Sequence, residues 1–157
     1  MSEQQQPQPQ FGIEKIYLKD MSLEIPNAPQ VFLDRETPQI EINVHNGASP
    51  LEQPGLYEVV LTVTVTAKIK DKTAFLVEVA QAGIFQIVNL PPQELDAVLG
   101  VLCPGTLLPY AREVVSSLMT RAGFPPVVLQ HMSFDVAYQE RMRQLQQEQA
   151  AQAGAPN

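Results

Sequence analysis

The chain has 157 residues, a length that suits one domain with one hydrophobic core. Charged residues make up only 17% of it against 45% apolar residues, so we expect part of the surface to be covered by something other than water. The net charge of −7 is concentrated in residues 1–67, which hold nine acids and three bases. This distribution argues against nucleic acid as a partner and favours a basic protein.

Targeting and redox signals point to the cytoplasm. Cys103 is the only cysteine, so no intramolecular disulfide and no C-x-x-C motif can form. The first residues, "MSEQQQPQPQ", lack the basic start and the apolar stretch of a signal peptide. Pro104, Gly105 and Pro109 interrupt the best apolar run before it reaches the roughly 18 residues of a spanning helix. We therefore expect a soluble cytoplasmic protein.

Composition divides the chain into one domain and two tails. Residues 1–10 are rich in Gln and Pro, and residues 148–157 are rich in Gln and Ala. Both stretches bury little and are expected to be disordered, the second as the frayed end of a helix. The ordered domain is predicted over residues 11–147.

Four strands are predicted in the first part of this domain. Residues 11–25 indicate the first strand, which ends at the proline-containing loop "PNAPQVF". In residues 39–47, Ile40, Ile42 and Val44 alternate with polar residues, and "NGASP" is expected to end this strand. Residues 57–69 alternate strictly, "KDK" indicates a hairpin turn, and a returning strand follows. The pattern predicts an antiparallel sheet with one dry and one wet face, with Leu76 on the wet face.

Two helices are predicted after the sheet. The first begins at "LPPQEL", should kink or break at "CPGTLLP", and ends at Gly123 before two prolines. Ser133 is the expected N-cap of the last helix. Four strands followed by two helices predict an α+β domain, a four-stranded antiparallel sheet with two helices packed on one face. The first helix is apolar on several sides, so it should face both its sheet and another subunit, and the candidate interface residues are Val98, Leu99 and Leu102.

Candidates for catalysis are few. His45 lies on the polar side of a predicted strand and His131 lies in a loop, and neither has a partner at a metal-ligand spacing. Cys103 lies in an apolar segment, where a lone cysteine is usually a packed hydrophobe. Nucleophile-elbow and phosphate-binding glycine motifs are missing from the sequence. We therefore expect neither an enzyme nor a bound cofactor or metal.

Two apolar loops suggest binding of extended peptide instead. "PNAPQVF" and "GFPPVVLQHMSF" place prolines beside large apolar residues, a combination suited to promiscuous peptide recognition. Phe32, Phe124 and Val127 could equally do no more than close the ends of the core. Asp20, Glu24 and Glu78 could likewise be ordinary solvated carboxylates on the wet face.

Several stretches resemble the SecB family, the bacterial cytosolic chaperones of preproteins. They are "IYLKDMSLEIPNAPQVF", "YEVVLTVTVTA", "TAFLVEVAQAGIF" and "LCPGTLLPYAREVVSSLMTRAGFPPVVLQHMSFD". With the final helix, the resemblance covers about residues 11–147. It implies a tetramer built as a dimer of dimers through the first helix. It also implies a holdase that binds unfolded preproteins in hydrophobic grooves and delivers them to the SecA ATPase.

The resemblance also implies site residues. The client-binding groove would be lined by Val31, Phe32, Ile40, Ile42, Val44, Phe124, Val127, Leu129, Phe134, Tyr138 and Met142. SecA would contact Asp20, Glu24, Leu76 and Glu78. The family's acidic tail is not matched here, since no charge follows Glu148, which puts a contribution of the tail to SecA binding in doubt. The alternative function is a structural oligomer or small-ligand carrier with the same fold.

Overall fold

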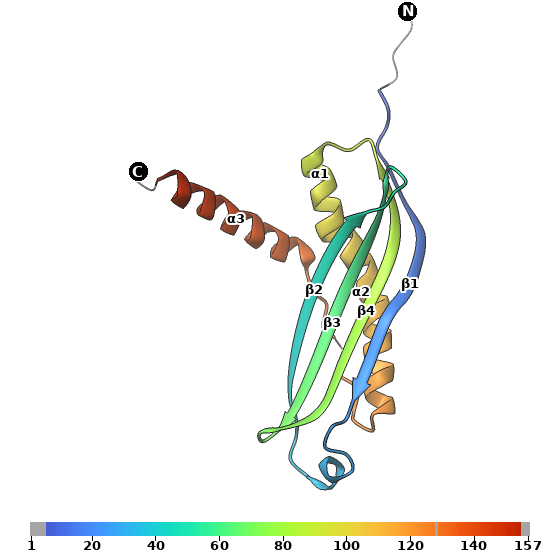
Figure 1. Ribbon diagram of the computed structural model, residues 1–157, viewed down its shortest axis with the longest axis vertical. Coiled ribbons are helices and arrows are strands. Elements are labelled where there is room, and N and C mark those ends of the chain that lie inside the picture. The colour runs from blue at the N-terminus through green and yellow to red at the C-terminus, as the bar shows by residue number, and fades with distance from the viewer. Residues whose placement is uncertain (1–5, 128, 155–157) are drawn as a thin grey trace, which may run out of the picture.

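A four-stranded antiparallel sheet covered by one long helix forms the body of the molecule (Figure 1). The computed structural model describes residues 6–127 and 129–154. The sheet order is β1-β4-β3-β2, with strands β1 (Gln10–Glu24), β2 (Gln39–Pro50), β3 (Leu56–Ile69) and β4 (Lys72–Val88). The helices are η1 (Gln30–Leu33), α1 (Pro92–Ala97), η2 (Val98–Leu102), α2 (Cys103–Arg121) and α3 (Phe134–Ala153). The predicted α+β class is confirmed.

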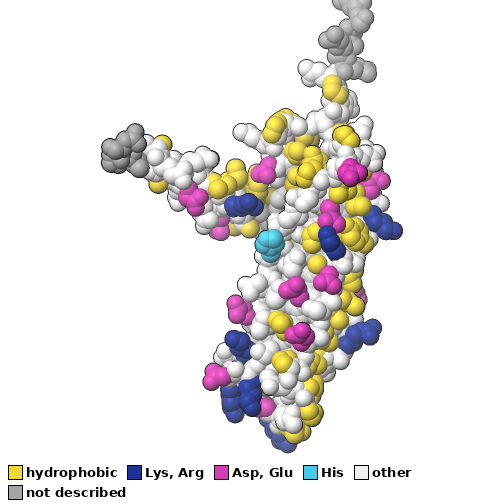
Figure 2. Space-filling view, in the orientation of Figure 1, with side chains coloured by type: hydrophobic (Ala, Val, Ile, Leu, Met, Phe, Trp, Pro, Cys, Tyr) yellow, Lys and Arg dark blue, Asp and Glu magenta, His cyan; other side chains and the backbone are white. Residues whose placement is uncertain are grey.

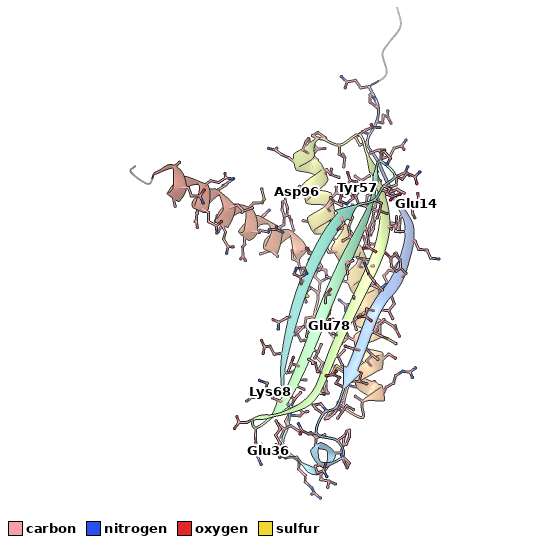
Figure 3. All side chains as sticks on the ribbon, viewed as in Figure 1. Glu14, Glu36, Tyr57, Lys68, Glu78 and Asp96 are labelled. Carbon is pink, nitrogen blue, oxygen red and sulfur yellow. The ribbon has the colours of Figure 1, made fainter. Side chains whose placement is uncertain are left out.

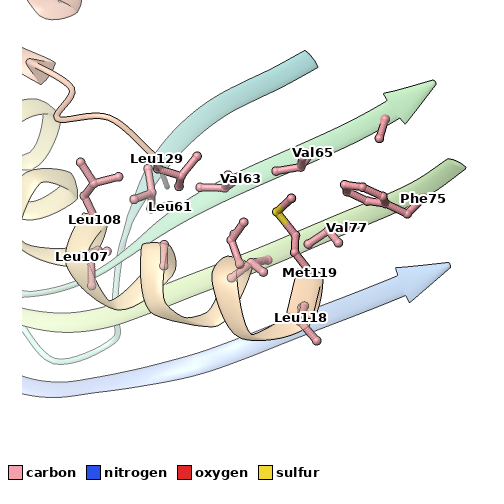
Figure 4. Close-up of a cluster of buried hydrophobic side chains, with 14 of the residues drawn as sticks. Leu61, Val63, Val65, Phe75, Val77, Leu107, Leu108, Leu118, Met119 and Leu129 are labelled. Carbon is pink, nitrogen blue, oxygen red and sulfur yellow. The ribbon is translucent and has the colours of Figure 1, made fainter. Parts of the chain in front are cut away.

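The core lies between α2 and the two central strands. We call the face of the sheet toward α2 the inner face and the opposite one the outer face. Alternate residues of β3 and β4 on the inner face are fully buried, and they pack against one side of α2 (Figure 4). The largest fully buried side chains are Phe75, Phe85 and Leu61 of the strands and Leu107 and Met119 of α2. The strict alternation of β3 is thus explained by one dry face, as predicted.

Strand β2 is three residues longer than predicted. "NGASP" was expected to end it at residue 47, but pairing with β3 continues until Pro50 lies opposite Tyr57. Because β2 is an edge strand, only one side of its backbone is needed for pairing, and a proline without an N–H is tolerated there. The predicted "KDK" hairpin turn is confirmed, with Lys70 in the left-handed region at φ 56°.

The first helix does not break at "CPGTLLP", where the sequence predicts a kink or a break. Residues 92–121 form one continuous helix, in which η2 is a turn of π-helix and the Cys103 N–H donates to the Val98 carbonyl. Pro104 follows the π turn directly and Pro109 lies inside α2, so the continuous helix accommodates both prolines. Among the described residues this is the one helix long and apolar enough to cross a membrane. Its buried side chains pack on β3 and β4, which makes it the core helix of the domain.

The end of α2 follows the predicted chemistry. Gly123 has φ 86°, its N–H donates to the Thr120 carbonyl, and the Phe124 N–H donates to the Met119 carbonyl. This pair of bonds is a Schellman motif, which needs a left-handed residue that glycine supplies without strain. The next helix, α3, begins at Ser133, whose hydroxyl accepts from the Val136 N–H at 3.5 Å. The predicted N-cap is confirmed.

The position of α3 corrects the prediction that both helices pack on the sheet. Its main contacts with the body are at η2, Tyr138 also hydrogen-bonds Asp96 of α1, and the far end projects away (Figure 1). Phe134 is the one buried residue of α3, and most of the others are Gln, Glu, Arg and Ala, so the helix has little apolar surface to bury on a sheet. The helix continues to Ala153, within the stretch 148–157 for which a tail is predicted. Residues 1–5 and 155–157 lie outside the described residues.

Candidate functional site

Three aromatic rings from separate parts of the chain meet at one end of the sheet. The ring centroids of Phe32 and Phe124 are 5.3 Å apart, and those of Phe75 and Phe124 are 4.8 Å apart. Phe75 is fully buried, whereas 46% of Phe32 is exposed. A side chain at Gly123 would lie 3.2 Å from the Phe32 ring, so the glycine that caps α2 also makes room for this aromatic cluster.

Strand β2 extends from the aromatic cluster along the edge of the sheet. Ile40, Ile42 and Val44 lie on its inner face, opposite Ala67, Val65 and Val63 of β3. Ile40 is 39% exposed, and the other two are partly buried against the core. Because β2 is an edge strand, the backbone N–H and C=O groups that point away from β3 have no partner strand in this sheet. An extended apolar segment therefore has both side-chain and main-chain partners here.

A groove lies at the other end of β2, between that strand, η2 and α3. It has a volume of about 540 Å³ and is lined by Asn46, Gly47, Ala48, Asp96, Leu99, Gly100, Tyr138, Arg141, Met142 and Leu145. Tyr138 covers Gly100, and its hydroxyl donates to the Asp96 carboxylate at 2.8 Å. This hydrogen bond is the main cause that raises the pKa of Tyr138. The bond fixes the wall of the groove that α3 provides.

The structure places the predicted groove residues at the two ends of β2, along β2, and beneath the surface. Phe32, Phe124 and Val127 are at least partly accessible at one end of β2, and Tyr138 and Met142 line the groove at the other. Ile40, Ile42 and Val44 connect the two ends. Val31, Leu129 and Phe134 are buried at 7%, 3% and 9% exposure, so they support the groove from below and offer little contact surface.

Sequence reasoning missed several groove residues. Strand parity places Phe75 on the core side of β4, which the structure confirms, but parity does not show its contact with Phe124. Leu99, a predicted interface residue, also lines the groove beside α3. Leu145 belongs to the same apolar stripe as Tyr138 and Met142, and that spacing was the available signal. Nothing in the sequence marks Gly100 as the contact of Tyr138.

Three carboxylates and one leucine come together on the outer face. Glu24 of β1 is directly opposite Leu76 of β4, and Glu78 is one row further along, opposite Ser22. Asp20 is opposite Ala80 in the next row. The three acids are exposed and Leu76 is partly exposed. Acidic side chains lie over the middle of this face, with Glu78 near its centre (Figures 2 and 3).

A second outer-face cluster joins β1 to β3 across β4. The Tyr17 hydroxyl donates to one carboxylate oxygen of Glu58, and Lys19 Nζ lies 2.7 Å from the other. These two contacts, with that of Lys19 the larger, lower the pKa of Glu58. Desolvation by burial, with a further contribution from Glu58, raises the pKa of Tyr17 to about 12. At neutral pH the carboxylate is therefore charged and the phenol keeps its proton.

Apolar side chains remain uncovered on the helix side of the molecule. Val98 and Leu102 line a different, shallow depression between η2 and the first turns of α3, and 47% of Leu102 is exposed. Further along, Tyr110 of α2 is 48% exposed, and β1 adds the exposed side chains Phe11, Ile13, Leu18 and Met21. These residues form a broad apolar surface, of the kind that subunit interfaces cover.

The candidates for chemical catalysis lie apart. His45 and His131 are both exposed, in β2 and in the loop before α3. Cys103 is buried, and this burial raises its pKa to about 12, so the thiol stays protonated at neutral pH. In the described part of the chain, no three His, Cys, Asp or Glu side chains are close enough to hold a metal ion. The fold and the groove define a protein that binds extended apolar segments.

Comparison with known proteins gives the family. The profile of the family described as preprotein translocase subunit SecB matches residues 4–145, so the chain belongs to the SecB family. The protein-export protein SecB of Methylobacillus flagellatus is 58% identical over 96% of this chain and 93% of its own. That of Chromobacterium violaceum is 56% identical over 98% of this chain and 99% of its own. The predicted family and its function, a preprotein-binding chaperone of protein export, are confirmed.

One solved structure shows the same fold. It is a SecB-like chaperone of Mycobacterium tuberculosis in complex with a peptide from an antitoxin, with a TM-score of 0.64. It is 18% identical in sequence and is matched over 78% of this chain and 91% of that one. At this identity the likeness supports the arrangement of sheet and helices, and no individual contact is transferred.

Proposed function

We propose that the chain is a cytoplasmic holdase that keeps preproteins unfolded along β2 and delivers them to SecA without catalysing a reaction. The observation that carries this proposal is the partly exposed aromatic cluster of Phe32 and Phe124 beside the open edge of β2. A binding site of this kind needs no nucleotide or metal. Release then depends on competition for the client rather than on a chemical step.

Burial of apolar surface supplies the affinity of the groove. Each Å² of apolar client surface removed from water contributes about 25 cal/mol, whichever residue provides it. The backbone groups along the edge of β2 add hydrogen bonds that are independent of side-chain identity. Both contributions predict broad client range and low sequence specificity.

Delivery is proposed to use the outer face of the sheet. Asp20, Glu24 and Glu78 surround the partly exposed Leu76, an arrangement suited to a basic SecA segment with an apolar anchor. This surface and the groove lie on different sides of the same sheet. SecA can therefore bind while the client is still held.

Assembly into a homotetramer, as a dimer of dimers, is proposed to cover the apolar surface around the first helix. Val98 and Leu102 lie on that surface, whereas Leu99 faces the groove beside α3 and is a weaker candidate for the seam. The stretches 1–10 and 148–157 are proposed to remain outside the assembly. The second has no charged residue after Glu148, so we expect it to add little to SecA binding.

Two double variants test the separation of the two sites. Phe124→Ser with Tyr138→Ser should weaken capture of an unfolded precursor by about tenfold or more, because the few anchor residues at the centre of an interface each cost about 2 kcal/mol or more when truncated. SecA binding and particle mass should stay unchanged. Asp20→Lys with Glu78→Lys should have the opposite effect: weak SecA binding and normal capture. Light scattering with and without precursor, and calorimetry with SecA, measure these outcomes.

Matched controls use exposed residues outside both sites. Val136→Ser removes an apolar side chain from α3, and Glu52→Lys with Glu94→Lys makes the same charge change as the acid variant. Equal effects of site and control variants would contradict the assigned surfaces. Failure of the unmodified chain to prevent precursor aggregation would contradict the holdase itself.

A further inference from the structure

Strand β1 carries an extra residue next to the acidic part of the outer face. Leu18 is opposite Gln81 of β4, and Asp20 is opposite Ala80, so Lys19 between them has no partner in the ladder. Such a residue is a β-bulge, which changes the face on which the following side chains lie. Tyr17, before the bulge, and Asp20, after it, both lie on the outer face.

The bulge decides which residues of β1 belong to the acidic surface. If Lys19 instead paired with Ala80, every later residue would move by one position. Asp20 would then be opposite Val79 on the inner face, and Glu24 would leave the outer face with it. Met21 would replace them on the outer side, because a slip of one residue turns a whole strand over. The presentation of two carboxylates therefore depends on the register of an edge strand.

The contacts of Glu58 hold this register. Lys19, the bulged residue itself, forms the 2.7 Å ion pair with Glu58, and Tyr17, two residues earlier, donates to the same carboxylate. Glu58 belongs to β3, on the far side of β4 from β1. The small residue Ala82 of β4 is fully buried beneath this connection, in the row that pairs it with Tyr17. One carboxylate thus connects the bulged residue, and the residue two positions before it, to the central strand β3.

We propose that Glu58 is a positioning residue for the partner that binds the outer face: through Tyr17 and Lys19 it fixes the bulge in β1 that keeps Asp20 and Glu24 beside Leu76 and Glu78. The inference rests on the proposed binding of SecA to that face. It assigns no contact between Glu58 and SecA. Its consequence is that changes at Glu58 act on delivery while leaving the client groove intact.

Two variants with opposite charge changes separate positioning from simple attraction. Glu58→Gln removes a negative charge, and Lys19→Met removes a positive one. If long-range charge alone mattered, the first would weaken binding of a basic partner and the second would strengthen it. Loss of the bulge predicts that both weaken SecA binding, by about tenfold, which corresponds to 1.4 kcal/mol. Glu52→Gln, at an exposed loop position with the same charge change as Glu58→Gln, should change it less than twofold.

Amide hydrogen exchange measures whether β1 keeps its register against β4. We expect faster exchange of the β1 amides from residue 20 to residue 24 in both variants, with unchanged exchange in β3 and unchanged precursor capture. Tyr17→Phe, which keeps the ring, should give a smaller effect and serves if a charge variant fails to fold. Opposite shifts of SecA affinity in Glu58→Gln and Lys19→Met, or wild-type exchange in β1, would overturn the inference. A wild-type chain that does not bind SecA would overturn the proposed delivery, while the exchange data would still decide the role of Glu58.

Discussion

Single side chains on the outer face combine structural and electrostatic roles. Glu58 is a partly buried carboxylate whose charge is stabilised by Lys19 and Tyr17, and the exposed acids Asp20, Glu24 and Glu78 remain available for a partner. The alternation of polar and apolar residues placed these acids on the correct face. It could not show the role of Glu58, because contacts between residues 17, 19 and 58 depend on a sheet order in which β4 separates β1 from β3.

Acid should weaken the contribution of Glu58 to stability. Its pKa lies below the ordinary value of 4.5, so its charge stabilises the folded chain at pH values above 4.5. That contribution is lost as the pH falls through the lowered pKa. Glu58→Gln should therefore reduce the free energy of unfolding by about 1 kcal/mol at neutral pH, after allowance for solvent exposure, and by much less in strong acid.

Urea denaturation at pH 7 and at pH 3 measures this difference. Glu52→Gln is the control, and its small effect should not depend on pH. An equal cost of Glu58→Gln at both pH values would show that the side chain acts through packing rather than through its charge.

The elements show where sequence patterns succeed and where they stop. Strict alternation in β3, the "KDK" turn, the Gly123 cap and the Ser133 cap are local signals, and all of them are confirmed. The π turn at Val98–Leu102 was missed because proline normally breaks a helix, and a wider turn that absorbs it has no sequence signature. The position of α3 was missed because an apolar stripe indicates a buried face without identifying what covers it. The stripe of α3 consists of Phe134, Tyr138, Met142 and Leu145.

The attachment of α3 should be sensitive to a methyl group at residue 100. A Cβ at Gly100 would lie 3.0 Å from the Tyr138 ring, which is too close without movement. Gly100→Ala should displace the ring, break its hydrogen bond to Asp96 and loosen α3, and exchange of the α3 amides should become faster. Gly105→Ala is the matched control, since its Cβ would lie 4.0 Å from Phe134, an ordinary contact. That variant should stabilise the helix by up to about 1 kcal/mol.

At the scale of the whole molecule, one sheet separates two kinds of surface. The apolar surfaces lie beside the long helix and along β2. Acidic side chains lie on the outer face (Figure 2). The low content of charged residues predicts the apolar surfaces, and the excess of acids in residues 1–67 predicts the acidic surface. The order β1-β4-β3-β2, which makes β2 an edge, could not be derived from periodicity, because any order of these strands gives the same alternation.

Leu102 provides a test of the proposed tetramer interface. Leu102→Asp places a charge on a residue that is 47% exposed in the single chain, so folding should be little affected. In a subunit interface the same charge would be buried without a partner, at a cost of several kcal/mol. Light scattering should then report dimers in place of tetramers. Leu51→Asp, at an exposed position in the β2–β3 loop, should keep the tetramer mass, and a tetrameric Leu102→Asp protein would contradict this seam.

Because α3 is attached to the body near one end, we expect it to act as an adjustable wall of the groove that turns about this attachment. At 1.5 Å per residue its 20 residues extend about 30 Å, and they are attached to the body mainly around Phe134 and Tyr138. In such a lever, a rotation of roughly 10° at the attachment moves the free end by about 5 Å while the hydrogen bonds of the helix stay intact. If a client binds here as proposed, we expect the width of the groove to follow the size of that client. Preproteins with bulky and with small side chains could then be held by one site, with the adjustment made by rotation of a rigid helix rather than by repacking of the core.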